Sequence, residues 1–524
     1  MRVAIIGAGV AGLTTAKVLL AAGHEIEVFD RTHDVGGVWS RSRRYPGVTT
    51  QSPKTQYEFS DFPMPKDYPE WPTGAQVQQY VQSYAAEFGL VPHLRLGTSV
   101  VSVAPSGPGW TVTTCPAGEA AEKVPGTTAY YDRVVVANGV FCEPSIPVFP
   151  GREDFEAAGG QVTAGSDFHD EEDARDRHAL VVGYGKSACD VTVPISRVAR
   201  STDVIARQLL WKIPRRIAGL LNFKMLMLTR MGEALFRYRR LRGVEKFLHG
   251  PGDRLRRGLL NALGRVAVRQ HRLARHGLVP RGSMEEIVKG AIGLVTEGFF
   301  EAVADGAIRV RRDTTIAWLG AADGRPVAGL SDGTVLPADL IVCATGFTQG
   351  VPFLDEAVLE RIFDERGTFM LYRQIQPIDV PGLYFNGYNS SFFSPLNAEL
   401  AALWIAADLA GALDLPMTSA RRADVIAQIA FMDEATDMHH CRGTKIIPFS
   451  MHHADEVLAD LGLQIGRFTR AVHWLNPVNP AAYRGVTPEL LKRLSAHTAP
   501  LRAAESPTTA SHEDGTPTHI QAPR

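Results

Sequence analysis

The chain has 524 residues, a formal net charge of −1, 45% hydrophobic residues and 21% charged residues. This composition is typical of a globular protein of several domains, and it argues against a disordered chain or a nucleic-acid-binding protein. The five cysteines show no CxxC pair, which argues against a disulfide framework, and no apolar run is long enough to span a bilayer. An odd, unpatterned cysteine count favours a reducing compartment, so we expect a cytoplasmic protein.

The N-terminus predicts a nucleotide-binding turn. An apolar strand at residues 3–6 runs into a GxGxxG motif, where a helix is expected to begin. A second strand, residues 25–30, ends in a carboxylate suited to a ribose diol, and a Gly-Gly-Val-Trp stretch at 36–39 follows as a further backbone approach with an aromatic lid. Together these features favour FAD, and its predicted contacts are Gly7, Gly9, Gly12, Asp30, Gly37 and Trp39.

A second glycine motif follows the predicted strand at residues 179–182. The strand after it, residues 203–206, ends in Arg207 and not in a carboxylate, with Lys212, Arg215 and Arg216 close behind. A cation at that position suits a 2′-phosphate, which favours NADPH over NADH. The predicted NADPH contacts are Gly183, Gly185, Ser187 and Arg207.

Strands alternate with helices, which predicts an α/β fold with two Rossmann-like, doubly wound domains. We expect the NADPH domain to be inserted in the FAD domain. Apolar strands at 338–343 and 383–385, and a helix at about 398–410, are expected to belong to the returning FAD domain. The predicted parts are residues 1–152 (FAD), 153–325 (NADPH), 326–498 (FAD and C-terminal region) and a disordered tail, 499–524.

A basic, mainly helical insertion is predicted at about 208–290. Between residues 207 and 281 the chain carries 19 Lys or Arg residues against three acidic ones, with apolar residues at near-helical spacing. The favoured interpretation is a cap whose apolar stripe packs on the core and whose arginines are solvated. The alternative is a docking face for an anion, which could be an acidic carrier protein, an acidic substrate or a membrane surface.

The arrangement resembles the flavin-containing monooxygenases and, more widely, the Baeyer–Villiger and N-hydroxylating monooxygenases. The most specific stretches are Tyr45–Lys54, Phe59–Pro65 and the Ala344–Phe347 strand end. The resemblance implies that NADPH reduces FAD and that O2 adds to flavin C4a. The resulting hydroperoxide then delivers one oxygen atom to a small or medium organic substrate, with N- or S-oxygenation favoured over Baeyer–Villiger oxidation. It also implies that Gln51, where the family often carries Asn, lies beside the reacting flavin as the catalytic amide.

Two departures from the family pattern leave an alternative open. The signature Phe-x-Gly-x-x-x-His that precedes the NADPH turn has Ala158 in place of the Phe and Ala164 in place of the His. A protein without that His could be an NADPH-dependent flavin oxidase or reductase that inserts no oxygen. The cofactor carries the chemistry in either case, so no catalytic triad is needed. No metal is expected, although His439, His440, Cys441, His452 and His453 are close in sequence. A homodimer is expected.

Overall fold

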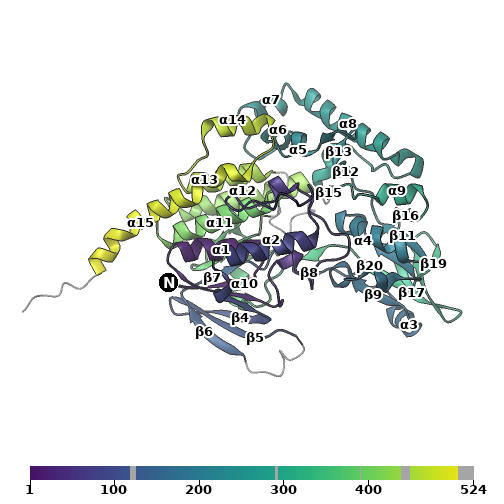
Figure 1. Cartoon of the computed structure of the whole chain (residues 1–524), viewed down its shortest axis with the longest axis horizontal. Helices are drawn as coiled ribbons and strands as arrows, with labels where there is room; N and C mark the ends of the chain where they lie inside the picture. Colours follow the sequence, from purple (N-terminus) through teal and green to yellow (C-terminus); the bar gives the residue numbers. More distant parts are fainter. Residues whose placement is uncertain (119–125, 290–292, 390, 438–448, 506–524) are drawn as a thin grey trace, which may run out of the picture.

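The computed structural model describes residues 1–118, 126–289, 293–389, 391–437 and 449–505. Two five-stranded parallel sheets form its frame, and helices of the basic insertion and of the C-terminal region gather on one side of them, at the top of Figure 1. The predicted α/β class with two Rossmann-like units is confirmed.

The first sheet has the strand order β24-β7-β1-β2-β3. Helices α1 and α11 pack against each other on one face, and the antiparallel sheet β4-β5-β6 covers the other face. Because both faces are covered, the strands are nearly all apolar. The predicted strand at 383–385 and the helix that follows it are confirmed here. The elements are β1 (Arg2–Ile6), α1 (Val10–Ala21), β2 (Glu25–Asp30), β3 (Leu94–Leu96), β4 (Thr98–Ser106), β5 (Gly109–Pro116), β6 (Thr127–Tyr131), β7 (Arg133–Val136), β24 (Leu383–Phe385) and α11 (Ser394–Leu409).

The second sheet has the order β16-β11-β10-β20-β9. Helices α4 and α9 cover one face, and helix α3 with the antiparallel sheet β17-β18-β19 covers the other. Its elements are α3 (Arg152–Ala157), β9 (Gln161–Ala164), β10 (His178–Val182), α4 (Lys186–Val198), β11 (Ser201–Ala206), α9 (Phe299–Ala304), β16 (Arg309–Arg312), β17 (Ile316–Ala322), β18 (Arg325–Leu330), β19 (Val335–Pro337) and β20 (Leu340–Cys343).

The predicted domain boundary at residue 326 is wrong. Strand β20 pairs with β10 and β9, so the second unit continues to Cys343. The chain leaves the first unit through β8 (Glu143–Pro144) and returns through β21 (Phe347–Thr348), and these two short strands pair with each other. The chain therefore crosses between the two units twice, and the two crossing segments pair with each other.

The basic insertion is mainly helical, as predicted. It contains α5 (Lys224–Met227), α6 (Arg230–Ala234), α7 (Val244–Leu248) and α8 (Asp253–Gln270). Part of its apolar stripe joins the core of the first unit, including Leu235 and Phe236, whereas Leu220 and Phe247 are exposed.

The expectation that the insertion's arginines are simply solvated is wrong for many of them. Arg230 makes a bidentate pair with Asp455 at 2.8 Å, and Arg239 pairs with Asp424 at 2.8 Å. Both acids lie outside the insertion, on α13 (Ser450–Asp460) and α12 (Thr418–Thr436). These pairs hold the insertion onto the C-terminal helices.

The C-terminal region adds α14 (Arg467–Leu475) and α15 (Val486–Glu505), and the helix α15 packs on α11. The predicted disorder from residue 499 is wrong as far as Glu505, because α15 continues to that residue, and residues 506–524 lie outside the described part. No helix within the described ranges has both the length and the apolar character needed to cross a bilayer.

Candidate active site

The first glycine motif lines a cleft at the carboxyl ends of β1, β2 and β7. Gly7 has φ of 115°, and a Cβ there would lie 2.4 Å from the carbonyl oxygen of Ala137. A Cβ at Gly12 would lie 1.8 Å from the carbonyl oxygen of Gly7. These two glycines therefore allow the turn itself, and any side chain at either position distorts it.

Gly9, at the same turn, lies against a second glycine-containing segment of the chain. It is the N-cap of α1, and a Cβ on it would lie 3.4 Å from the Cα of Gly37. The predicted Gly-Gly-Val-Trp stretch thus packs directly on the fingerprint. Both glycines line the cleft, and their bare backbone lets a large ligand approach the start of the helix.

The side chains of the cleft include the other predicted flavin contacts. Asp30 ends β2 and accepts hydrogen bonds from the backbone N–H groups of Ala8 (2.7 Å) and Thr32 (2.8 Å). Trp39 donates its indole N–H to the Tyr57 hydroxyl at 3.0 Å. Trp39 is buried and lines the cleft, and its predicted place as an aromatic lid stays a prediction.

Sequence reasoning missed several residues of the cleft. Arg31 and Arg43 line it and bring positive charge near the glycine turn. Ser394, at the start of α11, lines it as well, so two helix N-termini, those of α1 and α11, face the same space. An anionic ligand is favoured by all of these groups.

The second glycine motif forms a matching turn between β10 and α4. Gly183 has φ of 124°, and a Cβ there would lie 2.6 Å from the carbonyl oxygen of Ala344. Gly185 is the N-cap of α4 with an ordinary φ of −72°, and a Cβ there would meet nothing within 4 Å. The space in front of Gly185 is open, as a backbone contact with a nucleotide requires.

The other residues predicted at this turn, Ser187 and Arg207, lie in different surroundings. Ser187 accepts a hydrogen bond from the Tyr45 hydroxyl at 3.0 Å, so its side chain is already used by the first unit. Burial raises the pKa of Tyr45, which keeps this hydroxyl a donor. Arg207 follows β11 and is exposed. Beside it lies Arg312, also exposed, at the end of β16, where Ala206 and Arg312 are register partners. Sequence reasoning missed Arg312.

The stretch Tyr45–Lys54 is where the two units and the insertion meet. Gly47 lies against α4, where a Cβ on it would be 2.7 Å from the carbonyl oxygen of Asp190. Arg215 of the insertion donates to the Thr49 hydroxyl at 2.7 Å. Gln51 accepts from the backbone N–H of Leu294 at 3.4 Å. Gln51 is not among the residues that line the cleft, so its predicted place beside the flavin stays a prediction.

A buried ion pair on α4 lies next to this junction. Lys186 bonds to Asp190 one turn along α4, and Asp190 also accepts from the Thr296 hydroxyl at 2.6 Å. Burial lowers the pKa of Lys186, while the charge of Asp190 opposes that effect. Because both charged groups have hydrogen-bond partners within the protein, we assign them a structural role.

Of the histidines noted in the sequence, His452 and His453 lie in the described ranges, and both hydrogen-bond to other residues of the protein. His452 lies between Glu233 and Glu245, and His453 contacts the carbonyl oxygen of Arg373 at 2.8 Å. The described ranges contain no group of three or more His, Cys, Asp or Glu side chains that could hold a metal. His439, His440 and Cys441 lie outside those ranges.

A family model described as "Flavin-binding monooxygenase-like" matches residues 1–246, which include both glycine turns. A probable flavin-containing monooxygenase 1 of Arabidopsis thaliana is 29% identical over 88% of this chain and 92% of its own length. Flavin-containing monooxygenase 1 of Canis lupus familiaris is 27% identical over 89% of this chain and 84% of its own.

Residues 1–246 are therefore similar to the flavin-binding monooxygenase-like family, and most of the chain is similar to flavin-containing monooxygenases. The predicted resemblance and the predicted enzyme class are confirmed.

Solved structures agree with the fold of this family. S-allyl-L-cysteine S-oxygenase from Allium sativum superposes with a TM-score of 0.59 at 19% identity, covering 96% of this chain and 98% of that one. Cyclohexanone monooxygenase from Rhodococcus sp. Phi1, bound to NADP+, gives a TM-score of 0.64 at 16% identity, covering 88% and 97%. At these identities the likeness establishes the architecture of the flavin monooxygenases and not a substrate.

Proposed function

We propose that this flavin monooxygenase uses FAD and NADPH to add one atom of O2 to a small or medium organic substrate, with nitrogen or sulfur as the favoured acceptor. The observation that carries the proposal is the pair of glycine turns joined by the stretch from Tyr45 to Gln51. One turn opens on a large cleft, the other is open at Gly185, and the joining stretch contacts both units.

The residues present fit FAD in the first cleft. Gly9 and Gly37 leave room for a backbone approach, and Asp30 ends the strand where a ribose diol is recognised. Arg31 and Arg43 supply positive charge for a pyrophosphate. When bound, the flavin supplies the oxygen-activating chemistry.

The residues at the second turn fit NADPH. Gly183 forms the turn, and Gly185 leaves the start of α4 exposed to a pyrophosphate. Arg207 and Arg312 place two exposed guanidinium groups at the ends of adjacent strands, where the 2′-phosphate would lie. NADH has no 2′-phosphate, so these two guanidinium groups do not favour its binding.

Gln51 is the residue we assign to the reaction centre. Its carbonyl oxygen accepts a hydrogen bond from the backbone N–H of Leu294, which follows the insertion in β15 (Gly293–Leu294). This contact orients the amide and leaves its N–H groups to donate to the cofactor or substrate.

A second candidate function, an NADPH oxidase or reductase without oxygen insertion, is favoured by Ala164. This residue ends β9 at the carboxyl edge of the second sheet and is 1% exposed. Its methyl group cannot make the hydrogen bonds of the family's histidine.

One experiment tests the proposal. The purified protein is mixed anaerobically with NADPH or NADH while flavin absorbance is followed, and then with oxygen and candidate substrates. We expect flavin to co-purify, NADPH to reduce it faster than NADH, and peroxide release to fall when a suitable amine or thioether is present. A protein without flavin, or a flavin that NADPH does not reduce, would contradict the proposal. Peroxide release in full proportion to NADPH with every substrate would establish the oxidase instead.

A further inference from the structure

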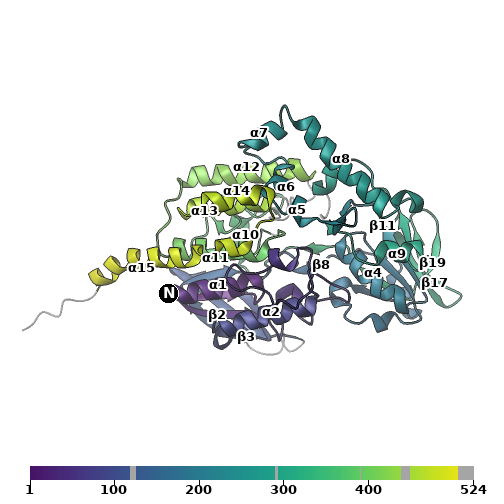
Figure 2. The same cartoon turned by 45° about the horizontal axis from the view of Figure 1, so that its top comes forward.

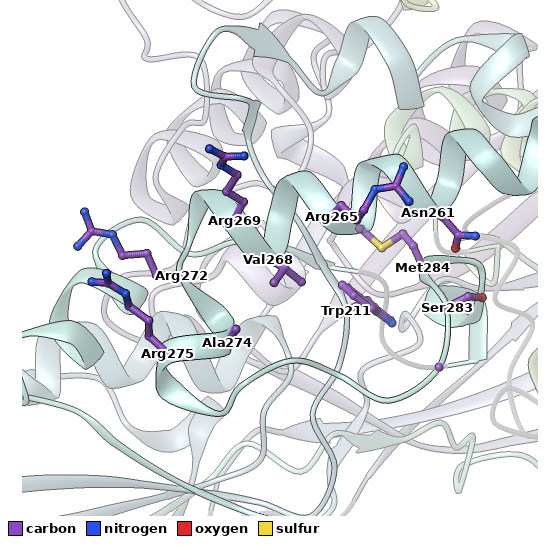
Figure 3. A pocket seen from close by; sticks show the side chains of 12 residues that line it. Trp211, Asn261, Arg265, Val268, Arg269, Arg272, Ala274, Arg275, Ser283 and Met284 are labelled. Atoms are coloured by element: carbon purple, nitrogen blue, oxygen red, sulfur yellow. The ribbon is translucent and has the colours of Figure 1, made fainter.

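A hollow of about 550 Å³ lies on the basic insertion, away from both glycine turns. Its lining comes from α8, from the short helix Leu273–His276 and from residues 282–284 (Figure 3). None of the predicted cofactor residues is among its lining. The lining residues are Trp211, Asn261, Gly264, Arg265, Val268, Arg269, Arg272, Ala274, Arg275, Gly282, Ser283 and Met284.

The hollow combines an apolar floor with a basic rim. Figure 3 shows Trp211, Val268 and Met284 in the middle of the site, and Arg269, Arg272 and Arg275 together at one end. The carboxylate of Glu286 lies beside Gly282, which is also part of the lining. Because Arg265 also lines the hollow, beside Asn261 at the other end, the rim is positive around the site.

The arginines of this rim differ from their neighbours in the insertion. Arg230, Arg239 and Arg256 are buried and ion-paired with carboxylates. Within the described ranges, the exposed side chains of the rim form no hydrogen bond or ion pair. These unpaired rim side chains are Arg265, Arg269, Arg272 and Arg275.

The local backbone places the four cations around the hollow. Arg265 and Arg269 are four residues apart on α8, so they share one face. Arg272 then adopts a left-handed φ of 50°, uncommon for a residue with a side chain, and the next short helix begins there. Like charges at helical spacing repel each other and destabilise a helix. A bound anion would offset this cost.

We propose that this hollow is the docking site for an acidic segment of a partner protein, in which Asp or Glu residues flank an apolar side chain. The apolar side chain would contact Trp211, Val268 and Met284, and the carboxylates would pair with the rim arginines. Arginine and tryptophan are enriched in protein interfaces for these two kinds of contact.

The shape of the site favours a protein over other anions. The hollow is wide open, whereas small-molecule sites enclose most of their ligand. Met284 is buried and Trp211 and Val268 are half-buried, so a flat membrane surface would contact little of this apolar lining, whereas a protruding side chain could enter the hollow.

The test uses the purified full-length protein with its flavin and a fluorescently labelled amphipathic peptide carrying Glu on one face and Leu on the other. The charge-reversal variant is Arg269→Glu with Arg272→Glu. The matched control is Arg237→Glu with Arg254→Glu, which makes the same change of charge at exposed arginines of the insertion outside the hollow. A third variant, Ala274→Trp, fills the hollow without changing the charge. Thermal unfolding of each variant verifies that it is folded.

We expect fluorescence anisotropy to show saturable binding that weakens with salt. The dissociation constant should rise at least about tenfold in Arg269→Glu with Arg272→Glu, and also in Ala274→Trp, but about twofold or less in the control. Saturating NADP+ should not displace the peptide.

Four results would overturn the proposal. The first is no saturable peptide binding, and the second is equal weakening in the control. The third is displacement by NADP+, which would assign the hollow to the cofactor. The last is arginine-dependent binding of phosphatidylglycerol vesicles or of pyrophosphate without binding of the peptide, which would assign it to a lipid surface or a small anion.

Discussion

The two glycines of the second turn predict opposite consequences of mutation. At Gly183 the φ of 124° and a Cβ position 2.6 Å from the carbonyl oxygen of Ala344 leave no place for a side chain. Backbone strain of this kind costs about 1–3 kcal/mol. We therefore expect Gly183→Ala to lose roughly that much stability, with a lower unfolding midpoint.

Gly185→Val should instead remove cofactor binding without unfolding the protein. Its φ of −72° suits any residue, and a Cβ there meets no protein atom within 4 Å. As an N-cap, glycine exceeds valine by about 1 kcal/mol or less. The added side chain would, however, occupy the space in which we place the NADPH pyrophosphate. We expect the NADPH dissociation constant to rise at least about tenfold, which corresponds to about 1.4 kcal/mol.

The assay pairs two measurements on each flavin-loaded variant. Calorimetric titration with NADP+ gives the dissociation constant, and urea unfolding gives the free energy of unfolding. A folded Gly185→Val protein that binds NADP+ as tightly as the parent would refute the assignment of this turn. A Gly183→Ala protein as stable as the parent would refute the packing argument.

Three other changes have defined outcomes. Replacing Arg207 and Arg312 by Gln should raise the KM for NADPH about tenfold or more and leave that for NADH unchanged, and steady-state kinetics with both cofactors test this. Burial opposes the charged form of His452, but its bonds to two glutamates outweigh this and raise its pKa to about 10. Its contribution to stability is therefore present below the unfolded pKa of about 6.5 and is lost as pH rises through 10, so His452→Gln should flatten urea-unfolding stability between those values. Burial raises the pKa of Glu399, on α11, to about 8, so between pH 4.5 and 8 the folded protein keeps this proton while the unfolded chain loses it. Stability should therefore fall over that range, and Glu399→Gln should remove that fall. A pH profile unchanged by either variant would contradict the respective assignment.

Both glycine turns could be predicted from the sequence because each is a local event. An apolar strand, a turn that needs a positive φ and the start of a helix follow one another within a few residues, so Gly7 and Gly183 are where the sequence indicates. Asp30 is predictable for the same reason, since it ends the next strand.

The parts that depend on distant pairing could not be predicted. Arg312 comes beside Arg207 only because β16 pairs with β11. The strand ending at Cys343 is apolar on both faces, and such a strand carries no mark of the sheet it joins. Arg230 looked solvated because its partner, Asp455, is 225 residues away.

The most direct test of oxygen insertion is the fate of isotopic oxygen. The flavin-loaded protein is supplied with NADPH, 18O2 and a panel of a tertiary amine, a thioether and a cyclic ketone, and products are analysed by mass spectrometry alongside peroxide. Our account predicts a single 18O atom in an N-oxide or sulfoxide, with peroxide well below the NADPH consumed. Recovery of all the electrons of NADPH as peroxide, with no labelled product, would contradict the account and establish the oxidase.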